Sequence, residues 1–160
     1  MKRFAAAILI CLALSPVSVF AKPFLIRATG VQVELPEYWG VRERESALMA
    51  SPRDGTLLLV FGVVMARNLD EAVKNLDKDL SKFVRSVKIE GKPEQTEING
   101  MRGFSVAASG ETEGKKVDIA TLLLETKSLN ILLVLGIGEK GQFEKHLPVV
   151  EQILGTLKPA

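Results

Sequence analysis

Three closely spaced turn signals in the second half of the chain constrain its fold more than any other feature. Asn99-Gly100 is the strongest short hairpin signal, because both residues tolerate the positive φ that a two-residue turn requires. Two further turn-rich stretches follow, at residues 110–114 and 126–128. The segments around these turns predict a meander of four strands: residues 94–98, 101–111, 116–125 and 129–137. Since hairpins join antiparallel neighbours, the predicted sheet is largely antiparallel.

The first half of the chain predicts further strands. They cover residues 24–27, 31–35, 47–51 and 56–65. The second of them alternates apolar and polar side chains, which is typical of a strand with one solvated face, and Pro36 ends it. Asp54-Gly55 predicts a tight turn between the last two. The stretch after Trp39 is less regular.

Two amphipathic helices are predicted, one before and one after the meander. In residues 69–87, apolar side chains recur with the 3, 4, 7 spacing of one buried stripe. Asn68 and Glu71 have the spacing of a capping box at its start. Residues 143–157 form the second helix, which either kinks at Pro148 or begins close to it. This order of elements predicts an α+β fold in which the two helices cover a largely antiparallel sheet.

The N-terminus has the layout of a secretory signal peptide, predicted to span residues 1–21. A short basic start precedes the unbroken apolar run of residues 4–14, and Val19-Phe20-Ala21 places small or modest side chains where a signal peptidase reads them. Cleavage is predicted between Ala21 and Lys22, leaving residues 22–160 as a single domain in the periplasm or outside the cell. An uncleaved signal that anchors the protein is the alternative.

The processed chain is predicted to be electrically neutral and free of thiols. Lys2 and Arg3 account for the excess of 21 basic over 19 acidic residues, and cleavage removes both together with Cys11, the single cysteine. A neutral chain has no long-range field to attract polyanions, so nucleic acid is not an expected partner. The remaining apolar runs are shorter than the roughly 20 residues that span a bilayer, so no transmembrane segment is expected after cleavage.

Several local motifs resemble the PsbP-like fold group. Residues 30–36, Gly-Val-Gln-Val-Glu-Leu-Pro, followed by Trp39, resemble that group's opening of a strand, Leu-Pro and then Trp. The Asn99-Gly100 hairpin, the meander and the closing helix around residues 153–157 fit as well. The group includes the PsbP protein of photosystem II, the yeast Ran-release factor Mog and bacterial DcrB-related exported proteins. The resemblance implies a fold that hosts regulators and assembly factors more often than enzymes, although a shared fold does not transmit function.

Residues 136–141 match the pattern G-x-G-x-x-G between an apolar strand and a helix. A dinucleotide site of this kind also needs a parallel strand that ends in an acidic residue roughly 20 residues further on. Ala160 follows the predicted helix directly, and Glu139 would place a negative charge in the phosphate cradle. These glycines are therefore expected to serve backbone geometry alone, and no cofactor is expected.

Two other residues are candidates for chemistry. Ser105, in Gly-Phe-Ser-Val-Ala, lies inside a predicted strand and not at the strand-to-helix turn of a nucleophile elbow. His146 is the single histidine, and the sequence shows no clustered ligands for zinc and no obvious nucleophile to pair with it. A surface or helix-cap role is predicted for His146. No catalytic, cofactor-binding or metal-binding residue is assigned.

Five residues are candidates for an interaction surface. Tyr38 and Trp39 are the only tyrosine and tryptophan, and we expect one of them in the core and the other at an interface. Lys74, Lys78 and Lys82 form a basic stripe on the first predicted helix, which could contact an acidic partner or, weakly, a membrane surface. Interleaved carboxylates cancel much of its field, so a solvated face is the competing interpretation.

The leading hypothesis is an exported, non-catalytic domain that docks on, or helps to assemble, a partner protein in the bacterial cell envelope. A carrier of small apolar ligands, using a cleft between helix and sheet, is one alternative. A carboxylate-based enzyme is another, and it would depend on residues such as Glu111, Glu113 and Asp118 facing each other in a cleft.

Overall fold

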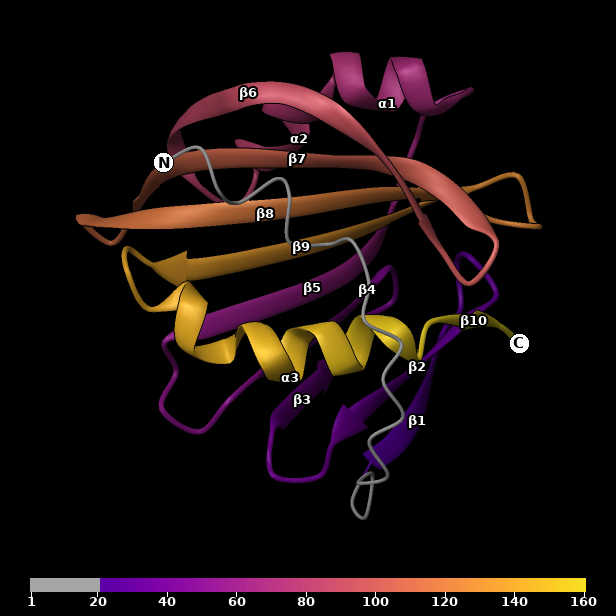
Figure 1. Ribbon diagram of the computed structural model, residues 1–160, viewed down its shortest axis with the longest axis horizontal. Coiled ribbons are helices and arrows are strands. Elements are labelled where there is room, and N and C mark those ends of the chain that lie inside the picture. Colours follow the sequence, from indigo (N-terminus) through magenta and orange to yellow (C-terminus); the bar gives the residue numbers. More distant parts are fainter. Residues whose placement is uncertain (1–20) are drawn as a thin grey trace.

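A computed structural model describes residues 21–160, so the predicted signal peptide lies outside the described residues except for Ala21 (Figure 1). Residues 21–160 form two antiparallel sheets and three helices. The large sheet has the order β3 (Gly40–Glu43), β4 (Ala47–Ser51), β5 (Leu57–Val64), β9 (Ile131–Glu139), β8 (Lys115–Glu125), β7 (Met101–Thr112) and β6 (Arg85–Ile98). The small sheet has the order β1 (Ala21–Ile26), β2 (Val31–Pro36) and β10 (Lys158–Pro159). The helices are α1 (Leu69–Lys74), α2 (Leu76–Leu80) and α3 (Phe143–Gly155).

The predicted four-strand meander is confirmed as β6 to β9. Asn99 and Gly100 have φ values of 49° and 82°, and they join β6 to β7 directly between the paired residues Ile98 and Met101. Both positive φ values belong to the turn type that matches the twist of antiparallel strands. The side-chain amide of Asn99 also donates to the carbonyl of Leu157 at 2.7 Å, so the same turn holds the end of the chain beside it.

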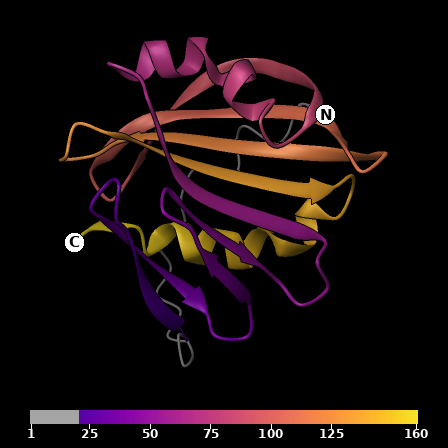
Figure 2. The ribbon, with the colours of Figure 1, turned by 180° about the vertical axis from the view of Figure 1, so that it is seen from behind.

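The large sheet is covered on both faces. On one face, Phe61 and Val134 pack in a cluster with Val150 of α3 and with the small sheet. On the other, Val60 packs in a second cluster with Leu76 and the rest of α1 and α2. Figures 1 and 2 show α3 on one side of the sheet and α1 and α2 on the other. The α+β prediction, with helices covering a largely antiparallel sheet, is confirmed.

The prediction of one long helix over residues 69–87 is wrong. The Asn68 cap is present, because its side-chain oxygen accepts from the backbone N–H of Glu71 at 2.9 Å. However, the helix is broken at Asn75 and ends at Leu80, and residues from Arg85 onward belong to β6. The segment also has the period of a strand, since two apolar residues in β6 alternate with charged ones. As a strand, this segment pairs its backbone N–H and C=O groups with those of β7. A surface helix would leave that edge of β7 without a hydrogen-bonding partner.

Other differences are smaller. Residues 91–93, expected to separate helix from meander, lie inside β6, where the register with β7 shifts between Glu90 and Glu94. Pro93 is tolerated there because β6 is an edge strand. The short strands β3 and β10 were not predicted, and α3 continues through Pro148. The strands also form two sheets and not one.

The buried stripe of α2 leads to a stability prediction. Leu80 is fully buried under the sheet, so Leu80→Ala should lower the free energy of unfolding by about 2–5 kcal/mol. Lys78→Ala, at an exposed position of the same helix, should change it by less than about 0.5 kcal/mol. Chemical denaturation measures both values. Equal effects would mean that α2 presents a different face to the core.

Candidate functional site

Tyr38 and Trp39 lie in the connection between β2 and β3. Trp39 is 5% exposed and belongs to the core cluster under α3, whereas Tyr38 is 52% exposed. The backbone N–H of Trp39 donates to the carbonyl of Pro36 at 3.0 Å, which closes a tight turn at the end of β2. The expectation that one of the two aromatic residues is in the core is confirmed. The backbone that carries the exposed ring of Tyr38 is thus anchored by the buried Trp39.

The three candidate lysines do not lie on one continuous helix. Lys74 is in α1, Lys78 is in α2 and Lys82 follows α2, because the predicted helix is broken at Asn75 and ends at Leu80. Lys82 also forms an ion pair with Asp79, with Nζ–Oδ1 at 2.7 Å. These helices cover the face of the large sheet opposite to the cluster that contains Trp39. Hence the structure does not bring the lysines together with Tyr38.

The glycines of the G-x-G-x-x-G pattern make room for an aromatic ring. Gly136 and Gly138 are in β9, and a Cβ at Gly136 would lie 2.8 Å from Cε2 of Phe143, the first residue of α3. Gly141 has a φ of 79° in the turn before that helix. Moreover, β9 is antiparallel to both of its neighbours, unlike the strands of a dinucleotide-binding unit. Gly141 fits the predicted backbone role, whereas Gly136 and Gly138 lie inside β9 and make room for a side chain, so backbone geometry alone does not account for them.

Gly136→Ala should therefore be destabilising by about 1–3 kcal/mol, because the added methyl group overpacks the Phe143 ring. Gly155→Ala is the matched control. Its Cβ would have no neighbour within 4 Å, and alanine in a helix is expected to leave stability unchanged or raise it by up to about 1 kcal/mol. Thermal unfolding compares the two variants. Saturable binding of NAD or ATP in calorimetry would contradict the packing interpretation.

His146 has partners that the sequence did not reveal. Its side chain is only 14% exposed, and its Nε2 lies 2.8 Å from Oγ1 of Thr56 and 3.6 Å from Oδ2 of Asp54. The Thr56 hydroxyl donates to Oδ1 of Asp54 at 2.8 Å, so it accepts from the imidazole N–H. His146 therefore lies partly exposed in the first turns of α3, and its contacts with the β4–β5 turn were not part of the predicted surface or cap role. The cluster fastens the β4–β5 turn to α3.

This cluster is not arranged as a catalytic triad. In a triad the imidazole lies between the hydroxyl and the carboxylate and removes the proton of the hydroxyl. Here both Thr56 and Asp54 approach the same nitrogen of His146, and the hydroxyl proton is directed at the carboxylate. The Thr56 oxygen is therefore not activated as a nucleophile.

Asp54 leads to a prediction about acid stability. Hydrogen bonds from the backbone N–H and the hydroxyl of Thr56 lower the pKa of Asp54 below its ordinary value. A lowered folded-state pKa stabilises the fold above the ordinary pKa, and this stabilisation is lost as the pH falls through the lowered value. Asp54→Asn should therefore show a smaller fall in melting temperature between about pH 5 and pH 2 than the parent.

The control for this prediction is Thr56→Val, which removes the hydroxyl and keeps the backbone N–H. We expect it to reduce the acid-dependent loss only in part. An Asp54→Asn curve parallel to that of the parent over the whole range would show that Asp54 makes no such contribution.

The carboxylates proposed for an enzyme lie near the β7–β8 turn. Glu111 and Glu113 are exposed, and Asp118 accepts a hydrogen bond from the backbone N–H of Gly141 at 3.3 Å. Among residues 21–160, no group of three or more His, Cys, Asp or Glu side chains is placed to hold a metal ion. Within the same residues, none of the helices has the length and apolar character needed to cross a membrane.

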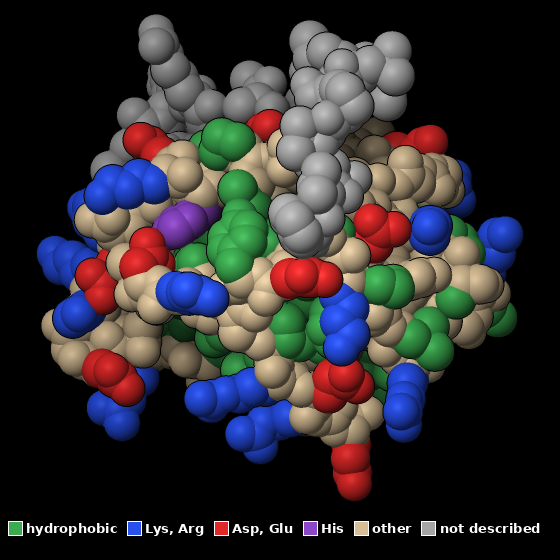
Figure 3. All heavy atoms as spheres, turned by 90° about the horizontal axis from the view of Figure 1, so that it is seen from below, with side chains coloured by type: hydrophobic (Ala, Val, Ile, Leu, Met, Phe, Trp, Pro, Cys, Tyr) green, Lys and Arg blue, Asp and Glu red, His purple; other side chains and the backbone are tan. Residues whose placement is uncertain are grey.

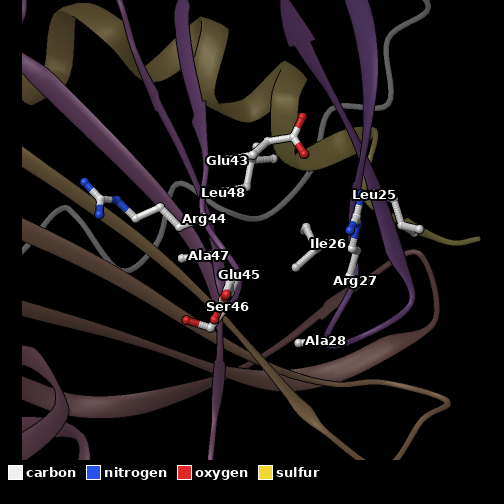
Figure 4. A pocket seen from close by; sticks show the side chains of 10 residues that line it. All are labelled: Leu25, Ile26, Arg27, Ala28, Glu43, Arg44, Glu45, Ser46, Ala47 and Leu48. Carbon is white, nitrogen blue, oxygen red and sulfur yellow. The ribbon is translucent and has the colours of Figure 1, made fainter.

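An open cleft of about 370 Å³ lies between the first strand of the small sheet and the β3–β4 hairpin (Figure 4). Its walls are residues 25–28 and 43–48. Ile26 and Leu48 form an apolar floor, and both are almost fully buried. The rim is charged, through Arg27, Glu43, Arg44 and Glu45. This differs from the apolar cleft between helix and sheet that the carrier hypothesis requires.

Charges of both signs are interspersed on the face of the molecule that is seen from below (Figure 3). Opposite charges also form exposed pairs such as Lys115–Glu139, with Nζ–Oε1 at 2.6 Å. A mixed surface of this kind produces little long-range field, in agreement with the balance of basic and acidic residues.

The chain matches no protein-family model, and no curated protein sequence matches it. The solution structure of cyanobacterial PsbP (CyanoP) from Synechocystis sp. PCC 6803 does match, with a TM-score of 0.61 at 8% identity, covering 92% of this chain and 99% of that one. This chain has a PsbP-like fold.

Two further structures share the PsbP-like fold. The Ran-binding protein Mog1p of Saccharomyces cerevisiae has a TM-score of 0.57 at 9% identity, covering 87% of this chain and 95% of its own. LpqN of Mycobacterium tuberculosis, described as involved in cell envelope biogenesis, has a TM-score of 0.53 at 12% identity, covering 87% and 91%. At such low identities the likeness establishes the fold and not the function.

Proposed function

We propose that this chain is an exported, non-catalytic PsbP-like domain that docks on, or helps to assemble, a partner protein of the bacterial cell envelope. The observation that carries the proposal is the half-exposed Tyr38 ring beside the buried Trp39. The predicted signal peptide supports export. Among proteins of the same fold, one is named as Ran-binding and another as involved in cell envelope biogenesis, which supports a role in protein contacts.

Tyr38 has the properties of an interface anchor. Its backbone is held by the turn from Pro36 to Trp39, and Trp39 is packed in the core, so little backbone freedom is lost on binding. A tyrosine ring buries a large area through only two side-chain torsions and can donate a hydrogen bond. For these reasons tyrosine is common among the few interface residues that contribute most of the binding energy.

In this proposal Tyr38 lies at the centre of the contact with the partner. The three lysines lie at the periphery of that contact or outside it. Lys74 and Lys78 are on helices that cover the opposite face of the large sheet. A single flat partner surface does not reach both faces. Lys78 therefore serves as a probe of where the partner lies.

A photo-reactive phenylalanine derivative in place of Tyr38 tests the proposal in cells. We expect it to give a discrete crosslinked product in the envelope fraction, because the ring is presented outward on a fixed backbone. The same group in place of Lys140, an exposed residue of the turn before α3, is the matched control and should give none. The partner is then identified from the crosslinked product by mass spectrometry.

Binding of the identified partner provides the quantitative test. Tyr38→Ala should weaken it by about tenfold or more, as expected for an anchor residue. Lys78→Ala should leave the affinity within about twofold. Crosslinking of similar yield from positions 38, 78 and 140 would contradict a specific interface at Tyr38, and the absence of any product from position 38 would contradict the proposal itself.

A further inference from the structure

The short strand β3 is the least protected sheet edge in residues 21–160. Four strands lie at an edge there, namely β1, β10, β3 and β6. An edge strand presents unpaired backbone N–H and C=O groups that can pair with another chain, and proline is one means by which proteins prevent such pairing. Three of the four contain a proline, which is Pro23 in β1, Pro159 in β10 and Pro93 in β6. The strand β3 has none, and its register with β4 is regular.

The register of β3 shows which of its backbone groups are free. The N–H of Arg44 donates to the carbonyl of Ala47 at 2.8 Å, in the turn that continues the β3–β4 ladder. In an antiparallel pair, residues bonded to the partner strand alternate with residues whose N–H and C=O groups point away from it. Counting back from Arg44, the backbone of Arg42 is bonded to β4. Val41 and Glu43 therefore direct their N–H and C=O groups to the free edge, and β3 pairs with no described strand besides β4.

This edge lies beside the open cleft between β1 and the β3–β4 hairpin. Glu43 and Leu48 are paired in the register and both line the cleft, so their side chains share the face of β3 and β4 that the small sheet covers. Leu25 stands on the opposite wall and is 50% exposed (Figure 4). Alternate side chains of a strand point to the same face of its sheet. A strand added to β3 would thus direct every second side chain toward the apolar floor of Ile26 and Leu48.

We propose that the free edge of β3 pairs with an extended segment of the partner protein, whose alternate apolar side chains enter the cleft. Such strand addition uses main-chain hydrogen bonds for affinity and the pockets beside the edge for specificity. An extended polypeptide supplies N–H and C=O groups at the spacing of Val41 and Glu43, which a lipid or a small solute does not. The rim carries two arginines and two glutamates, Arg27, Arg44, Glu43 and Glu45, so a strongly charged segment is not favoured.

A second copy of this chain is a poorer occupant of the edge. The antiparallel register that uses both free residues of each copy pairs Val41 of one with Glu43 of the other. That register places Arg42 directly opposite Arg42, and like charges in this position are destabilising. A second copy also provides no apolar alternation in β3, because Val41 is the only apolar side chain of the strand apart from Gly40.

Strand addition at β3 rests on the proposed function, because it specifies how the partner docks beside Tyr38. Only Trp39 separates Tyr38 from the first residue of β3. A segment that runs along β3 can therefore continue to the exposed ring. In this arrangement Tyr38 anchors the partner, and the backbone of β3 fixes the direction of the bound segment.

Photo-crosslinking in cells locates the segment. A photo-reactive phenylalanine derivative in place of Glu43 should crosslink the same partner as the one at position 38, at a nearby residue of the partner's sequence. The same group in place of Lys92, an exposed residue of the proline-containing edge strand β6, is the matched control and should give no product. A product from position 38 with none from position 43 would overturn strand addition alone. The absence of products from both positions would overturn the docking proposal as well.

Two substitutions at one position separate backbone pairing from a side-chain contact. Glu43→Pro removes the free N–H and leaves the hydrogen bonds between β3 and β4, because this N–H points away from β4. It should weaken binding of the identified partner by about tenfold or more. Glu43→Ala keeps the N–H and should change the affinity by less than about threefold. Equal effects of the two variants, or a loss with Tyr38→Ala and none with Glu43→Pro, would overturn the pairing.

Amide hydrogen exchange tests the pairing without any substitution. In the free chain, the amides of Val41 and Glu43 should exchange much faster than that of Arg42, which is bonded to β4. A synthetic peptide with the sequence of the crosslinked segment should slow both by about tenfold or more. Unchanged exchange of these two amides in the presence of bound peptide would overturn the proposal.

The amide of Leu25 is the internal control, since it lies at the free edge of β1 on the other wall of the cleft. Glu34, which is paired with Pro23, donates its N–H to Thr156 at 2.9 Å and not to β1. By the same alternation, Leu25 directs its N–H away from β2. It should stay fast in the complex. Protection of Leu25 in place of Val41 and Glu43 would mean that the segment adds to β1, contrary to the proposal.

The bound peptide and the oligomeric state provide the last test. Aspartate placed at successive positions of the peptide should weaken binding at every second residue, because alternate side chains enter the cleft. Equal effects at all positions would contradict an extended segment. Sedimentation of the exported chain alone should show a monomer. A dimer that dissociates in the Glu43→Pro variant would show that a second copy occupies the edge, and it would overturn the proposal.

Discussion

The arrangement of this protein depends on the burial of both faces of the β5–β9 pair. Every residue from Ile131 to Gly138 is buried, and so are most residues of β5. Each fully buried aliphatic or aromatic side chain contributes about 1.5–3 kcal/mol, against about 0–1 kcal/mol for an exposed ion pair such as Lys115–Glu139. Because the β5–β9 pair is apolar on both faces, each face must be covered by another part of the fold. The helix α3 with the small sheet covers one face, and α1 with α2 covers the other.

The way in which α3 is seated explains two features that had suggested chemistry. Gly136 and Gly138 leave space on β9 for the ring of Phe143, which begins the helix. With α3 in this position, His146 meets Thr56 of the β4–β5 turn at 2.8 Å. A motif that matches a nucleotide-binding pattern and the single histidine of the chain therefore both contribute to packing one helix on one sheet. Such residues acquire their roles from the contacts that the fold gives them.

Tyr38 extends one end of β2, where the turn after the strand places a half-exposed ring beside a buried indole. The backbone of this turn is held by the hydrogen bond from the N–H of Trp39 to the carbonyl of Pro36 and by the burial of Trp39 in the core under α3. Exposed loops on a rigid scaffold are where binding residues are most often found.

Local signals were sufficient where residues adjacent in sequence decide the conformation. Asn99-Gly100 and Asp54-Gly55 predicted turns that are present, the alternation in residues 31–35 predicted β2, and the four-strand meander followed from such turns. The α+β class could also be predicted, because apolar periodicity shows which segments need cover. The burial of one aromatic residue of the Tyr38–Trp39 pair was also predicted, on the ground that neighbours on an extended segment point in opposite directions, although the pair lies in a turn.

Tertiary structure decided what depends on distant partners. Residues 81–87 fit a helical stripe and a strand equally well, and the free edge of β7 decided for the strand from Arg85 onward. The partners of His146 come from a turn about 90 residues earlier in the chain. Met65 and Leu129 lie at the same end of the large sheet because Val64 and Ile131, at the ends of β5 and β9, pair with each other. A pattern within one segment cannot specify such contacts, because they are stabilised only when the whole sheet has formed.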